Sequence, residues 1–252
     1  MAKVHAYQPR LYRETMGNRR WMSFRAAWRE TDLWVAIDRE HYQHEAKRFT
    51  LDRIVYYRDI LENYISLRPE FRDSLTPVSV PDGSHPLIIS MSNAARQAGT
   101  GPLSAVAGAT AEYICGDIIE KFRAEEVIIE NGGDIFMKLT APVTVAVYAG
   151  DSPLSEKIAL RPAPCNTPLA VCCSSGTVGH SLSFGVADAC VIACRDGALA
   201  DAFATAFGNE VKGKEQLGAV TEKALKVPEI ISVVIVKDDQ VAMGGSLEIK
   251  LV

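Results

Sequence analysis

Two segments in the second half of the chain carry the side chains best suited to chemistry. The run Cys173-Ser174-Ser175-Gly176-Thr177-Val178-Gly179-His180 begins where an apolar stretch ends. Its glycines let backbone N–H groups approach a ligand closely, and its hydroxyls and imidazole offer hydrogen bonds and proton transfer. In the second segment, Asp201 and Thr205 are four residues apart and share one face of the helix expected there. Together the two segments indicate a site that holds an anion or a metal ion.

Each of these residues also has a purely structural interpretation. His180 follows glycines instead of lying on an apolar face, which favours a general base or a ligand contact, but a structural histidine fits equally well. Asp201 and Thr205 supply the hard oxygens that Mg²⁺ prefers. Taken alone, they are better explained as a solvated carboxylate and a threonine bonded to the preceding helical turn. A serine hydrolase is disfavoured, because Ser174 lacks the G-x-S-x-G pattern.

A third segment, Glu130-Asn131-Gly132-Gly133-Asp134, lies between two apolar runs. Asn-Gly between such runs is a strong signal for a tight β-hairpin turn. The glycine pair also exposes backbone N–H groups that can cradle a phosphate. The turn is the simpler interpretation, and a ligand-binding turn is the alternative. The small residues of Ala105–Ala111 allow close approach of either a ligand or another helix.

Hydrophobic periodicity and turn residues predict the elements that must position these segments. The predicted helices are 49–67, 91–96, 102–122, 197–209 (with Asp196 as N-cap) and 214–225. The predicted strands are 21–24, 32–37, 127–130, 135–139, 143–148, 157–160, 169–173, 189–194, 230–236 and 247–251. Strands and helices are segregated more than alternated, which predicts an α+β fold with a mainly antiparallel sheet flanked by helices. We expect a single domain over 1–252, with a hairpin and helix in 1–75 and a motif-bearing core in 101–210.

Composition narrows the class of protein further. The chain has 252 residues and a net charge of −4, which argues against nucleic acid as a partner. Residues 1–29 nevertheless form a basic arm, with the cations Lys3, Arg10, Arg13, Arg19, Arg20, Arg25 and Arg29. The start lacks the apolar region of a signal peptide, and no apolar run is long enough to span a membrane. We therefore expect a cytoplasmic protein with no membrane partner, whose six cysteines form no disulfides.

The order of these motifs resembles the ApbE superfamily, the flavin transferases that move FMN from FAD onto a protein threonine. Residues 127–135 are similar to its strand-then-Gly-Gly-Asp segment, and Ser174-Ser175-Gly176 followed by His180 is similar to its Thr-Ser-Gly…His stretch. Ala200-Asp201-Ala202-Phe203-Ala204-Thr205-Ala206 is similar to its Ala-Asp-Ala-x-x-Thr-Ala helix. The resemblance covers roughly residues 101–210 and favours a shorter prokaryotic branch whose activity is not established.

The resemblance implies a set of site residues. Asp201 and Thr205 would be metal ligands, and Ala107 would supply a carbonyl oxygen to the same metal. His180 would be the catalytic residue. The flavin-binding residues would be Asn131, Gly132, Gly133, Asp134, Ser174, Ser175, Gly176 and Thr177. The chain also departs from the superfamily: Gly108 replaces the lysine of the Gly-Ile-Ala-Lys-Gly-Tyr-Ala helix, and the motif after His180 is shortened.

Three hypotheses follow. The leading one is an ApbE-like protein that binds FAD, FMN or a related nucleotide with Mg²⁺ and transfers FMN or a nucleotidyl group. The second is a flavin- or nucleotide-binding module without catalysis, favoured by the missing lysine. The third is an interaction protein that uses the basic N-terminal arm. A homo-oligomer is compatible with all three.

Overall fold

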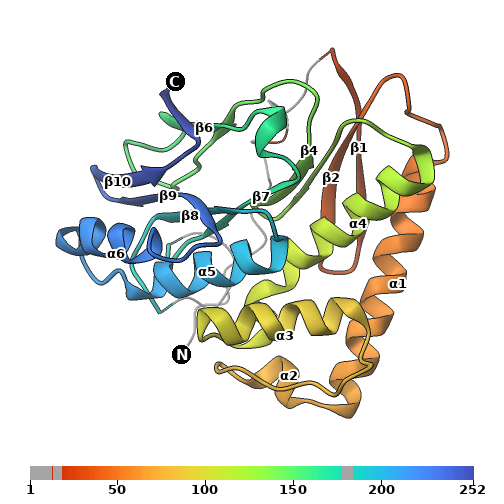
Figure 1. Ribbon diagram of the computed structural model, residues 1–252, viewed down its shortest axis with the longest axis horizontal. Helices are drawn as coiled ribbons and strands as arrows, with labels where there is room; N and C mark the ends of the chain where they lie inside the picture. Colours follow the sequence, from red (N-terminus) through yellow and green to blue (C-terminus); the bar gives the residue numbers. More distant parts are fainter. Residues whose placement is uncertain (1–12, 14–18, 178–183) are drawn as a thin grey trace.

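The computed structural model describes residue 13 and residues 19–177 and 184–252. Its central feature is an eight-stranded sheet in the order β1-β2-β3-β4-β7-β8-β9-β10, in which every neighbouring pair is antiparallel (Figure 1). The strands are β1 (Trp21–Trp28), β2 (Thr31–Asp38), β3 (Val127–Asn131), β4 (Asp134–Lys138), β7 (Leu169–Ser174), β8 (Ala189–Cys194), β9 (Ile230–Lys237) and β10 (Gln240–Gly245). A second sheet has the order β11-β6-β5 and is formed by β5 (Val145–Ala146), β6 (Ile158–Arg161) and β11 (Glu248–Leu251).

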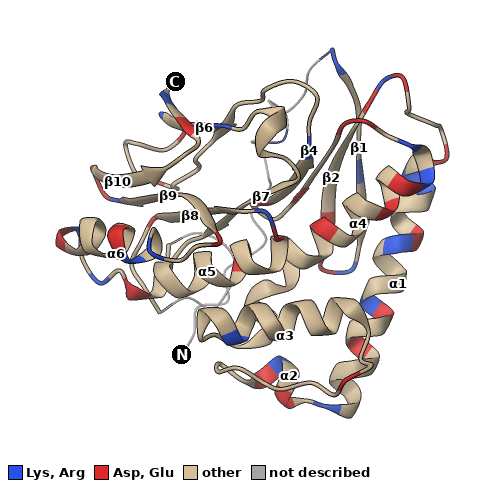
Figure 2. Cartoon of the chain, in the orientation of Figure 1, with Lys and Arg blue, Asp and Glu red and all other residues tan. Residues whose placement is uncertain are grey.

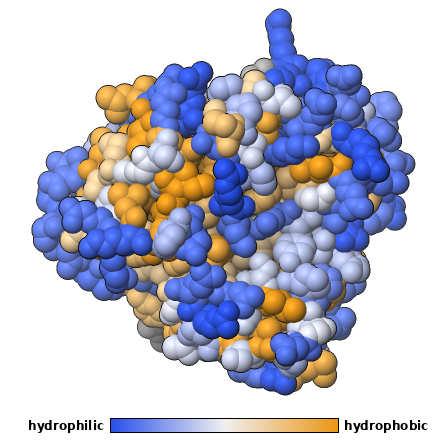
Figure 3. Space-filling view, in the orientation of Figure 1, coloured by the Kyte–Doolittle hydropathy of each residue, from blue (hydrophilic) through white to orange (hydrophobic). Residues whose placement is uncertain are grey.

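Both faces of the large sheet are buried, which explains why its central strands are apolar without alternation. On one face, Val35, Ile129 and Ile192 pack against the helices. On the other face, Ala36 and Ile128 join a second core with residues of the small sheet, such as Leu160. Polar residues cover much of the surface in Figure 3, and apolar residues gather at the upper left, where the small sheet meets the large one. The molecule therefore has three layers: helices, large sheet and small sheet.

The helices lie on one face of the large sheet. They are α1 (Ala46–Leu67), α2 (Glu70–Asp73), α3 (Pro86–Ala98), α4 (Val106–Phe122), α5 (Gly197–Glu210) and α6 (Leu217–Ala224). A 3-10 turn over Pro102–Ala105 precedes α4, and another over Lys214–Gln216 precedes α6. Figure 2 shows that α3 and α5 carry few charged residues whereas α1 carries many, as expected for inner and outer helices.

The predicted α+β class with a mainly antiparallel sheet is confirmed, and the predicted elements reappear at close to their predicted bounds. Asp196 caps α5 as predicted, because its Oδ1 accepts the N–H of Leu199 at 2.8 Å. Three elements were not predicted: α2, a 3-10 turn over Pro164–Asn166, and β10, which pairs with β9 through a turn at Asp238–Asp239. The strand predicted at 143–148 is confined to β5. Helices cover one face only, and the small sheet covers the other.

Helices α4 and α5 cross in close contact, and two glycines make that contact possible. A Cβ added at Gly108 would lie 2.1 Å from the carbonyl oxygen of Gly197. A Cβ added at Gly197 would lie 2.4 Å from the carbonyl oxygen of Gly108. The small residues at the start of α4 therefore serve close helix packing, one of the two functions weighed from the sequence.

This crossing predicts opposite effects for two substitutions in one helix. Gly108→Ala should lower the free energy of unfolding by about 1–3 kcal/mol, because the new methyl group would overlap backbone that cannot easily move. Gly116→Ala should raise it by about 0.5–1 kcal/mol, because the added Cβ meets no atom within 4 Å and alanine favours the helix. Urea denaturation of the three proteins is the measurement. Equal effects of the two substitutions would contradict the close crossing.

All six cysteines are free, as the sequence predicted. Cys165 is exposed, Cys173 is partly buried, and Cys115, Cys172, Cys190 and Cys194 are buried. Burial raises the pKa of the buried thiols, which makes them poor nucleophiles.

In the native protein, Cys165 should react with a thiol reagent well before the others. In denaturant without reductant, all six cysteines should react. Mass spectrometry of the modified peptides identifies the site. Rapid native labelling of Cys172 would contradict the packing between β7 and α5.

Candidate functional site

The predicted Gly-Gly turn connects β3 and β4 as a two-residue hairpin loop. Asn131 pairs with Asp134 across it, and Gly132 and Gly133 have φ angles of 71° and 108°. Positive φ at both central positions is typical of the tight turns that glycine permits. The Glu130 Oε1 accepts the N–H of Gly133 at 2.8 Å, which closes the turn. The hairpin prediction is therefore confirmed.

Asn131 connects this turn to the start of α4. Its Nδ2 donates to the carbonyl oxygen of Ala107 at 3.1 Å. Ala107 is the carbonyl that the resemblance assigns to a metal ion. Two of the residues predicted from separate motifs therefore lie in direct contact.

Asp201, in the second turn of α5, also binds the start of α4. Its Oδ2 accepts the N–H of Ala107 at 3.0 Å and the N–H of Gly108 at 2.9 Å. The side chain is buried, with 9% of its surface exposed. The interpretation of Asp201 as a solvated surface carboxylate is therefore wrong. Its carboxylate satisfies two of the N–H groups that the first turn of a helix leaves without partners.

Asp134 brings the end of β7 into the same cluster. Its Oδ1 accepts the N–H of Cys173 at 3.1 Å, and it too is buried. Burial and the charge of Asp134 together raise the pKa of Asp201 well above its ordinary value, while the amides of Gly108 and Ala107 oppose the shift. Two buried carboxylates that disfavour each other's charge would both gain from a cation placed between them. The cluster thus has the electrostatics of a site for a positive ion.

The loop after β7 is fastened at several described points. Gly176 donates its N–H to the carbonyl oxygen of Ala187 at 2.8 Å. Thr177 donates its hydroxyl to Asp188 at 3.2 Å and its N–H to the hydroxyl of Ser175 at 3.1 Å. Asp188 also accepts the N–H of Asp238 at 2.6 Å. No sequence motif indicated Asp188, because its side-chain partners come from two segments far apart in the chain, at Thr177 and at Lys237 and Asp238.

The same loop packs against the C-terminal end of α5. A Cβ added at Gly176 would lie 2.3 Å from the carbonyl oxygen of Gly185, and one added at Gly185 would lie 1.9 Å from that of Gly208. The Oγ of Ser174 would lie 3.8 Å from a Cβ added at Gly208. Ser174 therefore lies against α5, the helix that contains Asp201. Thr205, one turn after Asp201 on α5, is partly buried.

The predicted residues that the structure brings together are Ala107, Asn131, Asp134 and Asp201, with Gly132, Gly133 and Ser174–Thr177 at the adjoining turn and strand end. His180 lies outside the described residues, and its assigned function remains a prediction. No cluster of three or more His, Cys, Asp or Glu side chains able to hold a metal occurs in the described part of the chain. Any metal at this site would thus need backbone, hydroxyl or ligand oxygens as well.

Four described arginines of the basic N-terminal arm, Arg13, Arg20, Arg25 and Arg29, pair with carboxylates of the domain. Arg13 binds Asp32 at 3.0 Å and Glu130 at 2.5 Å. Arg20 and Arg25 bind Glu126 and Asp32 at 2.7 Å and 2.6 Å, and Arg29 binds Glu62 at 2.5 Å. These four guanidinium groups are paired within the domain, which weakens the hypothesis that the arm binds another molecule. Through Glu130, Arg13 also supports the Gly132-Gly133 turn, a function that no sequence motif indicated.

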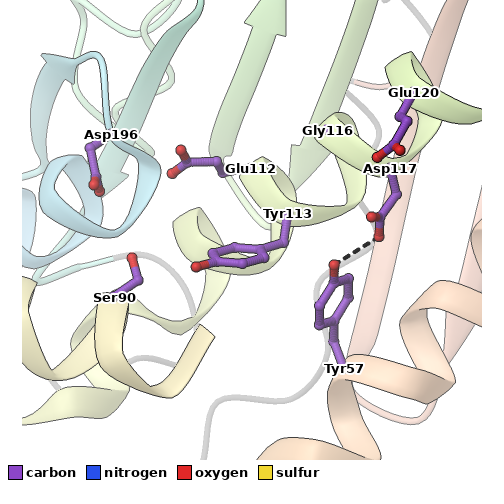
Figure 4. A pocket seen from close by; sticks show the side chains of 8 residues that line it. All are labelled: Tyr57, Ser90, Glu112, Tyr113, Gly116, Asp117, Glu120 and Asp196. Atoms are coloured by element: carbon purple, nitrogen blue, oxygen red, sulfur yellow. Dashed lines mark hydrogen bonds between the residues drawn. The ribbon is translucent and has the colours of Figure 1, made fainter. Parts of the chain in front are cut away.

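A separate pocket of about 420 Å³ opens between α1, α3, α4 and the start of α5 (Figure 4). It shares no lining residue with the cluster around Asp201. Glu112 and Asp196 face each other across it from α4 and α5. The Glu112 Oε2 accepts the N–H of Gly197 at 2.7 Å. Burial and the nearby charge of Asp196 raise the pKa of Glu112 to about 7.

A model of the AbpE bacteria family matches residues 13–228. The chain belongs to this family. It is 36% identical over 222 residues to a UPF0280 protein of Methanococcus aeolicus, covering 86% of this chain and 88% of the relative. It is 34% identical over 232 residues to a UPF0280 protein of Methanocaldococcus jannaschii, covering 90% of this chain and 92% of the relative.

The fold is that of solved ApbE proteins. The apo form of the flavinyl transferase ApbE from Pseudomonas stutzeri superposes with a TM-score of 0.52 at 12% identity, covering 89% of this chain and 93% of the other. The ApbE protein of Thermotoga maritima superposes with a TM-score of 0.55 at 13% identity, covering 90% and 96%. The resemblance to the ApbE superfamily is therefore confirmed. No helix among the described residues is long and apolar enough to cross a bilayer.

The capping function of Asp201 can be separated from its charge. Asp201→Ala should lower the free energy of unfolding by about 1–2 kcal/mol, because two helical N–H groups lose their acceptor. Asp201→Asn should cost less, since an amide oxygen can still accept both bonds and a buried charge is removed. Thermal and urea denaturation at pH 8 test this order. Equal loss in both variants would mean that the charge, not the acceptor, stabilises α4.

The raised pKa of Glu112 makes stability depend on pH. The folded state holds a proton on Glu112 up to about pH 7, whereas a glutamate in the unfolded chain releases it near its ordinary pKa of 4.5. Stability from this group is therefore fully present below pH 4.5 and is lost as pH rises through 7. The loss should be on the order of 2 kcal/mol, reduced by solvent in the pocket.

Denaturation curves of the wild type and Glu112→Gln between pH 5 and 8 measure this contribution. The difference between the two proteins should change with pH in the direction just given. A pH-independent difference would contradict the raised pKa.

Proposed function

We propose that this protein binds a flavin nucleotide with Mg²⁺ at the cluster formed by Ala107, Asn131, Asp134 and Asp201. The observation that carries the proposal is the pair of buried carboxylates, Asp134 and Asp201, one of which is fixed on the first-turn amides of α4. Membership of the AbpE bacteria family and the ApbE fold supply the expectation of a flavin ligand.

The residues of the cluster fit a magnesium ion. Mg²⁺ prefers hard oxygens and usually shares one or two carboxylates with substrate phosphates. Asp201 and Asp134 supply carboxylate oxygens, and Thr205 adds a hydroxyl on the next turn of α5. The carbonyl of Ala107 already accepts a bond from Asn131, so it would bind a metal only if Asn131 shared or released it. When bound, the ion would neutralise the charge of the diphosphate.

The finer proposal is transfer of FMN from FAD. An acceptor hydroxyl oxygen would bond to the phosphorus on the FMN side of the diphosphate, while the bond from that phosphorus to the bridging oxygen breaks and AMP leaves. The hydroxyl proton would pass to His180 as general base, an assignment that rests on the motif alone. The amide of Gly132 would approach the phosphates, since no side chain shields it. Those of Gly133 and Gly176 already donate to Glu130 and Ala187 and would have to share or release these bonds to do the same.

The second candidate is a binding module without catalysis, and one structural observation favours it. Gly108 occupies the position of the superfamily's lysine, and the carbonyl of Gly197 leaves no room for any side chain there. A cation at that helical position is therefore excluded in this chain. If the lysine is needed for transfer, this protein would bind flavin without turning it over.

Calorimetry with FAD, with and without Mg²⁺, tests the binding proposal. We expect Mg²⁺-dependent binding that weakens by about tenfold or more in Asp201→Asn, because this variant keeps the helix cap but loses the charge. Asp151→Asn, at an exposed turn, is the matched control and should bind as the wild type does. FAD binding that ignores both Mg²⁺ and Asp201→Asn would overturn the proposed site.

Release of AMP from FAD in the presence of a threonine-containing acceptor distinguishes the two candidates. Chromatography of the nucleotides would detect it. AMP formation that His180→Ala abolishes without loss of FAD binding supports the transferase. Tight FAD binding with no AMP, whatever the acceptor, supports the binding module.

A further inference from the structure

We infer that Glu112 is a positioning residue of the candidate site: by fixing the first residue of α5 on α4, it holds Asp201 in place. The inference rests on the proposed function for its consequence in ligand binding, but its structural content does not depend on any ligand. Glu112 lies outside the sequence motifs that identify the site, and its side chain lines the pocket in Figure 4.

The geometry is a reciprocal exchange between two helices. Asp201 of α5 accepts two N–H groups from the first turn of α4, those of Ala107 and Gly108. Glu112 of α4 accepts the N–H of Gly197, the first residue of α5, at 2.7 Å. Each helix therefore provides the carboxylate that satisfies the start of the other, where the helix dipole also favours a negative group.

The two ends of this exchange are rigidly connected. Gly197 and Asp201 are one helical turn apart in α5, so a shift of Gly197 moves Asp201 with it. The backbones of Gly108 and Gly197 are already in contact, which limits the directions in which α5 can move. Loss of the bond to Glu112 would free the start of α5 to rotate or lift, and would lengthen the bonds of Asp201 to α4.

The surroundings of Glu112 disfavour the charged form of its carboxyl group. Asp196, the N-cap of α5, faces it and raises its pKa, and Asp117 and Glu120 line the same pocket from α4. Tyr57 of α1, Ser90 of α3 and Tyr113 of α4 complete the wall. Asp117 is paired with Arg53 at 2.6 Å, so its charge is largely compensated. The N–H of Gly197 opposes these effects, because a hydrogen bond to the Glu112 carboxylate favours its charged form.

Amide hydrogen exchange of Ala107 and Gly108 tests the inference without a ligand. In Glu112→Ala, exchange at these two amides should become about tenfold faster or more, beyond the change expected from global stability. In Glu112→Gln, it should stay within about threefold of the wild type, because the amide oxygen can accept the N–H of Gly197. Val220→Ala, a core truncation in α6, is the control for general destabilisation.

FAD binding in the presence of Mg²⁺ gives the second measurement on the same four proteins. The Glu112→Ala variant should bind FAD about tenfold more weakly, a loss typical of residues that orient a ligand-binding side chain without touching the ligand. Glu112→Gln should restore binding. Above pH 7 the wild type and Glu112→Gln should differ most in exchange at Ala107 and Gly108, because the ionised carboxylate is a stronger acceptor than the neutral amide.

The outcomes separate the two proposals. If the wild type does not bind FAD, the proposed function fails, while selective exchange at Ala107 and Gly108 in Glu112→Ala would still support the positioning inference. If the wild type binds FAD but Glu112→Ala changes exchange no more than Val220→Ala does, the positioning inference is overturned. Failure of Glu112→Gln to restore both measurements would also overturn it.

Discussion

The crossing of α4 and α5 is the constraint on which the candidate site depends. Two helices begin side by side, and the N–H groups of their first turns lie in the interior, where water cannot satisfy them. Asp201 of α5 accepts N–H groups at the start of α4, and Glu112 of α4 accepts the N–H at the start of α5. The solution requires close approach, which only glycine at positions 108 and 197 permits. The placement of Asp201 is therefore a property of the helix pair and not of α5 alone.

The large sheet presents the remaining site residues to this crossing. The hairpin between β3 and β4 and the end of β7 reach the same edge, so Asn131, Asp134 and Cys173 arrive from strands that pair directly or through one neighbour. Burial of both sheet faces, under helices on one and the small sheet on the other, fixes these strands. A rigid framework of this kind lets two carboxylates remain close although each disfavours the charge of the other.

The replacement of the superfamily's lysine has a physical cause in this chain. The Gly197 carbonyl occupies the space that a side chain at position 108 would need. Close packing of α4 on α5 and a cation at that position exclude each other. The chain has the fold of the ApbE proteins. At position 108, where the superfamily motif has lysine, it has a glycine at a close helix crossing. Chemistry that needs a cation at this point would have to obtain it from a bound ion or from elsewhere in the protein.

Local sequence determined much of this protein. Apolar periodicity placed the long helices and most strands, glycines at 132 and 133 determined the hairpin, and Asp196 determined the start of α5, because each of these features depends on residues close in the chain. The strand β10 was not predictable in the same way, since its partly exposed residues lack a clear alternation and its pairing with β9 defines it.

Only the tertiary structure decided what the polar residues do. Asp201 could have been a solvated helical carboxylate, and Glu112 carried no motif at all; their partners lie 94 and 85 residues away in the chain. Whether such a residue caps a helix, binds an ion or faces water depends on what packs against it. That depends in turn on how the layers close, which no short stretch of sequence specifies.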